Sequence, residues 1–327
     1  DCLLSRGLGD VYKRQLPRPL PAIAALPPSP ATWMPSRCWA STFTPDRVAI
    51  CFTRSSQAQW SLQTDQRFVM LPYFLGCPSW NEPAWRGSFY PPDLNMTDSV
   101  EHYCRVFNAV EGNTTFYARP DGDKLARWVA RMPAHFRFCA KVPRDISHEG
   151  DLREQLGSTQ AFLDLLAPLG ERVTPLWLQL PAMFGPARLG ELALWLDEFA
   201  QRRLAVEVRH PAFFDKGDDE RVLNRLLHER GVERICLDSR ALFSCTSRDP
   251  AVLHAQSKKP RLPIRPAAFT DSPQVRFIGG PDLEANQPFL EPWLDKVAAW
   301  IEQGLTPHVF LHLSLIHISE PTRQEAI

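Results

Sequence analysis

The sequence predicts an α/β protein, a TIM-like (β/α)8 barrel of parallel strands. Three observations predict it. The chain holds eight short apolar runs, amphipathic segments separate most of them, and neighbouring runs follow at intervals of about 27 to 40 residues. The span from 70 to 312 is also close to the ~250 residues typical of such barrels. The eight runs lie at 73–77, 108–112, 136–141, 175–180, 204–209, 234–238, 274–279 and 308–312.

The amphipathic segments between the runs predict helices. Segments 99–107 and 188–201 each place their apolar residues on one helical face. Segments 220–231 and 292–304 each end in glycine, which commonly follows a helix, and the second also begins with proline, which suits a first turn. Strands that alternate with helices in this way are typical of a parallel sheet.

The two ends of the chain do not fit this pattern. Residues 1–15 and 313–327 resemble peptides translated from sequencing-adapter DNA, and we interpret both as artefacts. Residues 16–69 begin with a proline-rich stretch that cannot sustain a helix or a central strand. We expect a disordered extension there, either a linker or translated upstream DNA. The barrel domain is therefore predicted to span 70–312, to start at Met70 and to lack its last helix.

The composition is that of an ordinary globular protein and argues against several classes. Lys+Arg and Asp+Glu both number 37, so the formal net charge is zero and general nucleic-acid binding is not expected. No apolar run is long enough to span a bilayer, so we expect no membrane partner. None of the eight cysteines forms a C-x-x-C pair, which indicates buried thiols and a reducing, cytoplasmic compartment.

A polar or charged residue ends seven of the eight predicted strands. Active sites of (β/α)8 barrels lie at the C-terminal ends of the strands. A single buried charge there could belong to a structural ion pair, whereas a ring of such residues at one end of the barrel indicates a site. The residues are Glu111, Lys141, Gln179, Glu207, Arg209, His210, Asp238, Arg276 and His312.

Six segments, in this order, carry a family resemblance. They are GCPSWNEPAWRGSFYP (76–91), VEGNTTFYARP (110–120), FRFCAKVPRDISHE (136–149), LQLPAMF (178–184), VEVRHPAFF (206–214) and RFIGG (276–280). The pattern resembles the YecE-like proteins of domain-of-unknown-function family 72 (DUF72), over about 70–312. The resemblance implies a TIM-barrel-like fold, in agreement with the strand count. It implies no settled biochemical activity.

The sequence departs from the commoner pattern of that family in two places. Arg276, Phe277, Ile278 and Gly279 stand where the family usually has Arg-Leu-His-Gly, which weakens any catalytic role for that histidine. The polar loop and helix that follow the eighth strand in the family are replaced here. We therefore expect site residues from the eighth loop to be absent.

The carboxylates Glu111, Glu207 and Asp238 are the predicted catalytic residues. Each can act as a general acid or base, or bind a metal ion. Glu207 and Asp238 end successive strands, and neighbouring strands lie ~4.8 Å apart, so the two could share one ligand or one proton. The alternative is structural: Glu207 pairs with Arg209, Arg240 or Lys141 and fills the barrel mouth.

The other polar residues are predicted to bind an anionic substrate. Lys141, Arg209 and Arg276 can clamp a phosphate or carboxylate. The Gly279-Gly280 pair follows the seventh strand, where such barrels often bind phosphate. Side chains beside Glu111 can hold it, or a ligand, by hydrogen bonds. The full predicted set is Asn113, Thr114, Lys141, Gln179, Arg209, His210, Arg276 and Gly279.

Two readings of the function remain open. The first is a barrel enzyme that acts on a small anionic or phosphorylated substrate by carboxylate acid/base chemistry. A variant adds metal-assisted phosphoester hydrolysis, with His148 and His210 beside the carboxylates, although no tight metal-ligand spacing supports it. The second is a non-catalytic ligand-binding barrel whose polar ring is structural. P-loop, nucleophile-elbow and dinucleotide-binding motifs are absent, and the cofactor is left open.

Overall fold

A computed structural model describes residues 71–87 and 89–313. The predictions made for residues 1–70 and 314–327, including the extension, the start at Met70 and the missing last helix, lie outside these residues.

All eight predicted runs contain strands, and the sixth is divided in two. β6 and β7 together form the sixth strand of the barrel, and the ladder is interrupted between them at Ile235. The strands are β1 (Phe74–Cys77), β2 (Ala109–Gly112), β3 (Arg137–Ala140), β4 (Leu176–Gln179), β5 (Leu204–Glu207), β6 (Glu233–Arg234), β7 (Cys236–Asp238), β8 (Gln274–Ile278) and β9 (His308–His312).

The strands are parallel throughout and lie in the order of a TIM-like barrel. One sheet has the order β3-β2-β1-β9-β8-β7 and the other the order β4-β5-β6. The two sheets meet at the β6–β7 interruption and between β3 and β4, where one isolated bridge joins Lys141 and Trp177. The predicted α/β class and barrel are thus confirmed, with two hydrogen-bonded sheets in place of one continuous ladder.

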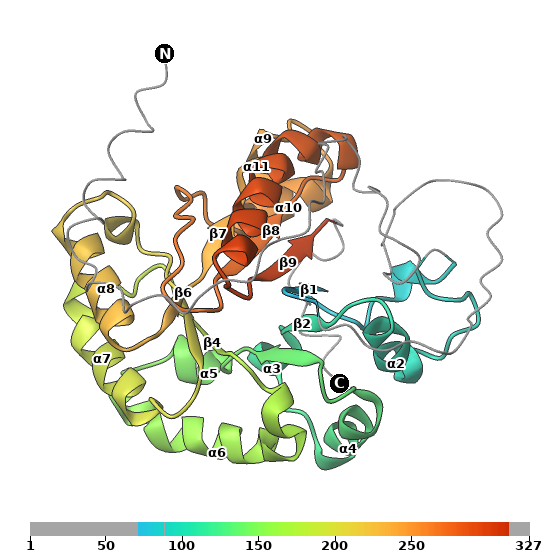
Figure 1. Ribbon diagram of the computed structural model, residues 1–327, viewed down its shortest axis with the longest axis horizontal. Coiled ribbons are helices and arrows are strands. Elements are labelled where there is room, and N and C mark those ends of the chain that lie inside the picture. The colour runs from blue at the N-terminus through green and yellow to red at the C-terminus, as the bar shows by residue number, and fades with distance from the viewer. Residues whose placement is uncertain (1–70, 88, 314–327) are drawn as a thin grey trace, which may run out of the picture. The chain divides into compact units, whose positions relative to one another are not determined.

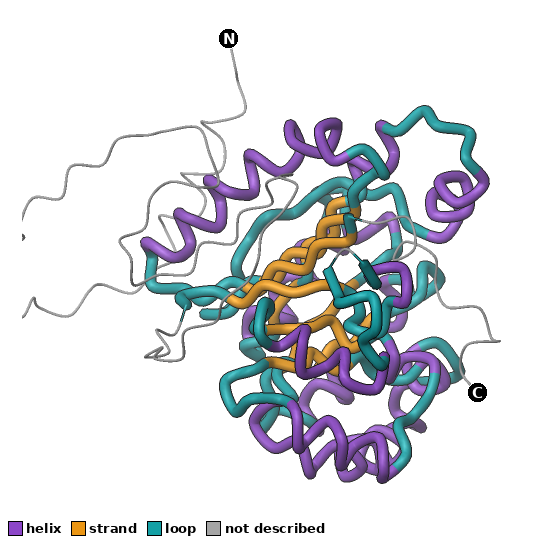
Figure 2. Tube along the Cα trace, turned by 90° about the vertical axis from the view of Figure 1, so that its right-hand side faces the viewer, coloured by secondary structure: helices purple, strands orange, loops and turns teal. Residues whose placement is uncertain are grey.

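Helices lie outside the strands, as Figures 1 and 2 show. They are α2 (Ser99–Cys104), α3 (Thr114–Tyr117), α4 (Gly122–Arg131), α5 (Arg144–Ser147), α6 (Leu156–Leu166), α7 (Leu189–Glu198), α8 (Asp218–Glu229), α9 (Arg240–Ser244), α10 (Pro250–Lys258) and α11 (Leu283–Glu302). Short 3-10 helices are η1 (Pro83–Trp85), η2 (Met96–Asp98), η3 (Leu152–Gln155), η4 (Ala167–Arg172), η5 (Pro186–Arg188) and η6 (Pro211–Phe213).

The predicted start of the last helix before β9 is wrong. The helix begins at Leu283 and contains both Pro288 and Pro292, whereas the sequence pattern placed Pro292 in its first turn. The physical start signal is Asp282, whose side chain accepts hydrogen bonds from two backbone N–H groups of the first turn.

Strand periodicity places the polar ring inside the barrel. An interior apolar layer, drawn from six different strands, contains Ala109, Cys139, Trp177, Ala205, Ile235 and Phe310. Side chains alternate between the two faces of a strand, so the residues two positions later also point inward. On five strands these later residues are Glu111, Lys141, Gln179, Glu207 and His312.

We expect Gly76→Ala to destabilise the barrel strongly. A Cβ atom at Gly76 would lie 2.1 Å from the backbone oxygen of Ala109 on the neighbouring strand. A backbone atom cannot move aside without breaking the ladder, so the free energy of unfolding should fall by about 3 kcal/mol or more in urea titrations. The control is Gly190→Ala in α7, where an added Cβ atom would meet no described atom beyond its own stretch of helix within 4 Å, so stability should stay equal or rise slightly. Equal losses in both variants would contradict this account.

Candidate functional site

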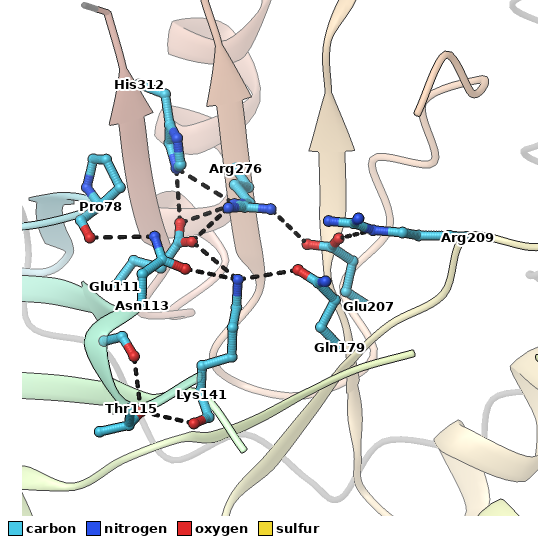
Figure 3. A network of polar contacts seen from close by, with 11 residues as sticks. Pro78, Glu111, Asn113, Thr115, Lys141, Gln179, Glu207, Arg209, Arg276 and His312 are labelled. Carbon is cyan, nitrogen blue, oxygen red and sulfur yellow. Dashed lines mark hydrogen bonds and ion pairs between the residues drawn. The ribbon is translucent and has the colours of Figure 1, made fainter. Parts of the chain in front are cut away.

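Six polar side chains from six barrel strands meet at the carboxyl ends of the strands, and we call them the mouth cluster (Figure 3). All are almost completely buried, between 0% and 2% exposed. Buried charges are stable only when paired, so the contacts among these residues decide what the site can do. The cluster consists of Glu111, Lys141, Gln179, Glu207, Arg276 and His312.

Arg276 lies at the centre of the mouth cluster and bridges its two carboxylates. Its Nε and Nη2 donate to the two oxygens of Glu111 at 2.9 and 2.6 Å, a bidentate pair. Its Nη1 lies 3.3 Å from Oε2 of Glu207. The guanidinium carbon also lies 5.6 Å from the ring centre of Trp177 in the interior layer. One arginine thus fixes both carboxylates from above a buried aromatic ring.

Lys141 is the second cation of the cluster. Its ammonium group donates to the side-chain oxygens of Asn113 at 2.7 Å and Gln179 at 3.0 Å, and lies 3.4 Å from Glu111. Burial lowers its pKa to about 8, with Arg276 adding to the effect and the two carboxylates opposing it. The pKa of Lys141 therefore lies much closer to neutral pH than that of an ordinary lysine.

Both carboxylates are held in the ionised form. Burial by itself would raise the pKa of Glu111, but Arg276, the contact with His312 and Lys141 reverse this and hold the pKa well below its ordinary value. Burial opposes a similar shift at Glu207, where Arg209, Arg276 and Lys141 lower the pKa to about 2. Neither group carries a proton at neutral pH, so neither can serve there as a general acid.

His312 is neutral and forms a hydrogen bond with Glu111. Burial lowers its pKa to about 3, with Arg276 contributing and Glu111 opposing. Its Nε2 lies 2.8 Å from a Glu111 oxygen and 3.3 Å from Arg276 Nε, and the shorter contact favours a proton on Nε2. The Nδ1 atom is then an acceptor, and no residue within 71–87 or 89–313 donates to it.

Two further predicted residues border the mouth cluster. Arg209 donates through Nε to Glu207 at 2.8 Å, and its side chain is 12% exposed. Asn113 accepts from Lys141 and donates to the Pro78 carbonyl at 3.2 Å. Arg209 and Asn113 thus lie beside Glu207 and Lys141, and both are partly exposed to solvent.

Thr114 lies outside the cluster, and its neighbour Thr115 supports the cluster from below through the backbone of Lys141. Thr114 is exposed at the start of α3. Thr115 is buried, and its hydroxyl lies 2.8 Å from the Gly112 carbonyl and 2.7 Å from the Lys141 carbonyl. It therefore ties the ends of β2 and β3 together and fixes the backbone that carries Lys141. The sequence contains two adjacent threonines, and residue type alone could not show which of them is buried.

Asp238 is the main correction to the predicted site. It pairs in register with Phe277, which packs against Trp293 of α11 on the outside of the barrel. Its carboxylate is bound there by Arg240 and by the indole N–H of Trp293. The inward position on this strand belongs to Leu237, which pairs with Arg276. Asp238 and Glu207 therefore do not face one another across the mouth.

His210 and Gly279 also have structural partners away from the cluster centre. His210 accepts from the Ala212 N–H at 3.2 Å and caps η6. The Gly279 N–H donates to the His312 carbonyl, and the Gly280 N–H donates to Asn286 at 2.7 Å. Both glycine amides are thus engaged within the protein, so they do not form the open phosphate-binding turn that the sequence suggested.

The residues proposed for a metal variant are not brought together. His148 contacts the Ser147 hydroxyl through Nδ1 at 2.8 Å, in the loop after β3. Across the described ranges, no three His, Cys, Asp or Glu side chains gather as a metal site would require. The donor set of the mouth cluster, with a cation beside each carboxylate, does not fit a divalent metal ion.

Comparison with known proteins identifies the family. The family model for "Protein of unknown function DUF72" matches residues 74–318. The chain belongs to the DUF72 family. It is 42% identical over 240 residues to the UPF0759 protein YecE from two strains of Escherichia coli, covering 73% of this chain and 85% of each relative. The resemblance drawn from the six segments is thus confirmed.

Solved DUF72 structures share the fold. A DUF72 family protein from Enterococcus faecalis superposes with a TM-score of 0.55 at 18% identity, covering 74% of this chain and 90% of that one. One from Thermotoga maritima gives a TM-score of 0.55 at 21% identity, covering 75% and 96%. In the described part of this DUF72 protein, no helix is long and apolar enough to cross a membrane.

We expect Lys141 to titrate near pH 8 in the folded protein. Its ordinary pKa is 10.5, so between pH 8 and 10.5 the unfolded chain binds the extra proton. The contribution of this group to stability should therefore rise with pH across that window. Side-chain NMR of 13C-labelled lysine should show one signal with a midpoint near pH 8 that Lys141→Met removes. Lysine signals that all titrate near pH 10.5 would refute the assignment.

We expect Glu111→Gln to lower the free energy of unfolding by about 3–5 kcal/mol, because it leaves Arg276 and Lys141 without their shared buried carboxylate. The folded pKa of Glu111 is lowered, so the stability it contributes is present above the ordinary value of 4.5 and lost as the pH falls below it. Urea unfolding at pH 7 and at acidic pH measures both effects, and the acid-side loss should be smaller in the variant.

The matched control for this substitution is Glu101→Gln. Glu101 pairs with Arg105 on the surface, where the two side chains are 52% and 58% exposed. Solvent screening limits such a pair to less than about 1 kcal/mol. If the two variants lost similar amounts of stability, the mouth cluster would not be held by the ion pairs described.

Proposed function

We propose that this DUF72 protein is a barrel enzyme that binds a small anionic or phosphorylated substrate at the mouth cluster, with Lys141 transferring the proton. The observation that carries the proposal is a surplus of positive charge. Within the described part of the chain, Lys141, Arg209 and Arg276 pair with two carboxylates, Glu111 and Glu207, and His312 is neutral. A buried site with one uncompensated cation favours an anionic ligand.

The partly exposed residues indicate how a substrate would enter. Arg209 is the one cation of the three whose side chain is more than 3% exposed. Within the described residues, Arg209 uses its Nε to bind Glu207. Its two terminal nitrogens can therefore bind an incoming phosphate or carboxylate. Asn113 lies on the same side and orients the Lys141 ammonium toward the cluster.

We assign the role of general acid or base to Lys141 because the two carboxylates are poorly suited to it. The oxygens of Glu111 and Glu207 accept hydrogen bonds from arginine, lysine or histidine, and their pKa values are lowered. A general acid or base works best when its pKa lies near the working pH, and Lys141 meets that condition at about 8. The carboxylates then orient Arg276 and Lys141, which changes their role from the one predicted by the sequence.

A second candidate is a non-catalytic barrel whose polar cluster is structural. One observation favours it: polar side-chain contacts join the parts of the barrel where backbone pairing is weak. Arg276 of the six-stranded sheet contacts Glu207 of the three-stranded sheet, and Lys141 contacts Gln179 across the single β3–β4 bridge. This candidate predicts no stabilisation of the protein by any small anion.

Thermal unfolding of the full chain with sugar phosphates, nucleotides and small carboxylates separates the two candidates. A ligand of the folded state at 100 times its dissociation constant stabilises by about 2.7 kcal/mol. Arg209→Gln should then weaken binding of the stabilising compound at least about tenfold, because a hydrogen bond to a charged group contributes about 1.5–3 kcal/mol. Lys141→Met should remove any turnover of that compound.

Arg203→Gln is the matched control. Arg203 directly precedes the same strand, β5, and its side chain is 63% exposed at the opposite end of the barrel. The Arg203→Gln substitution removes the same charge as Arg209→Gln but does not alter the mouth cluster, so ligand binding should be unchanged. A panel in which no anion stabilises the protein would overturn the enzyme proposal, as would equal losses of binding in both arginine variants.

A further inference from the structure

We propose that this protein has a second binding site, outside the barrel wall, for a small aromatic anion such as an aryl phosphate. The site is a cleft of about 480 Å³ between α9, the 261–263 segment and α11, which we call the outer cleft. Small-molecule sites commonly measure about 300–1,000 Å³. Its principal lining residues are Arg240, Phe243, Arg261, Leu262, Pro263 and Phe289.

Arg240 is held in position by a buried carboxylate. The Asp238 carboxylate is fully buried. It accepts hydrogen bonds from the backbone N–H, Nε and Nη2 of Arg240, at 3.0, 3.0 and 2.8 Å. The indole N–H of Trp293 fixes the same carboxylate at 2.7 Å. The guanidinium also lies 5.7 Å from the ring centre of Phe289, and 40% of the Arg240 side chain is exposed. The cleft therefore has a preorganised cation whose remaining face is open to a ligand.

Arg261 supplies a second cation without a balancing carboxylate. Its guanidinium lies 5.6 Å from the ring centre of Phe243. Among the described residues it has no hydrogen bond or ion pair to a side chain. Asp238 already balances Arg240, so the described residues give the outer cleft one surplus positive charge. Two arginines line the cleft, and one of their two charges is not balanced. This arrangement favours a ligand with a phosphate or carboxylate group.

The apolar walls specify the rest of the ligand. Phe243 and Phe289 are half-buried, and Leu262 and Pro263 complete the lining. Such surfaces bind a flat apolar ring, and each arginine guanidinium lies within 6 Å of the centre of one of the two phenyl rings. An inorganic anion would use the cations and leave these walls wet. The cleft therefore fits an anion that also carries an aromatic ring.

The outer cleft is separate from the mouth cluster. Arg276 points into the barrel from β8, whereas Phe277, the next residue, points outward and pairs with Asp238. The two sites therefore lie on opposite faces of the β7–β8 wall. Helices α9 and α11, which line the cleft, lie side by side outside that wall (Figure 1). Asp238, which the sequence assigned to catalysis, anchors this second site.

Calorimetric titration of the full chain with phenyl phosphate tests the proposal. We expect saturable binding, and at least about tenfold weaker binding of inorganic phosphate and of neutral phenol, because each lacks one of the two recognised features. Arg261→Gln should weaken phenyl phosphate binding about tenfold or more. It should not disturb the fold, because the side chain forms no ion pair with a described residue.

Two controls separate this site from general charge effects and from the mouth cluster. Arg248→Gln removes the same charge from an exposed residue that does not line the cleft, and binding should change by less than about twofold. Lys141→Met alters the mouth cluster and should also leave binding unchanged. Absence of saturable phenyl phosphate binding, equal effects of the two arginine substitutions, or loss of binding in Lys141→Met would each overturn the proposal. If inorganic phosphate bound as tightly as phenyl phosphate, the cleft would not recognise the aromatic ring, and that part of the proposal would be overturned.

Discussion

The bridge from Arg276 to Glu111 and Glu207 is the interaction on which the mouth of the barrel depends. Removing two carboxylates and a guanidinium from water is costly, and only mutual contacts offset that cost. Glu111 and Arg276 belong to the six-stranded sheet and Glu207 to the three-stranded sheet. The same contacts that stabilise the charges therefore join two sheets that share no continuous ladder. Ligand binding at this site would have to add to these pairs without separating them.

Much of this arrangement could be predicted from the sequence. The eight apolar runs identified the strands, and their polar ends identified the side of the barrel that carries charge. Glu111, Lys141, Gln179, Glu207 and Arg276 meet as expected, since parallel strands end at one rim. What a run cannot show is which of its last residues faces inward. The break at Ile235 hides the inward position of Leu237, so Asp238 was assigned to the wrong face.

Side-chain environment explains why the proton role moves from a carboxylate to a lysine. Residue type alone made the glutamates the natural acid/base candidates. The pKa of each group depends on contacts between residues far apart in the chain, such as the Glu111–Arg276 pair, which no local pattern reveals. Arg276 and Lys141 lower the pKa values of both carboxylates, and burial lowers that of the lysine. Within the mouth cluster, the group whose pKa lies nearest neutral pH is thus Lys141, which the sequence assigned to substrate binding.

Alternation along β7 and β8 gives one wall two chemical faces. Arg276 faces the interior with its carboxylates, while Asp238 and Phe277 face α11. A buried aspartate on the outer face needs a cation, and Arg240 supplies it from the first residue of α9. Because Asp238 directs that guanidinium toward a cleft that also holds Arg261, a carboxylate without a place in the mouth acquires a function through the arginine it orients. The two sites share a wall but no side chain, so each can be altered without the other.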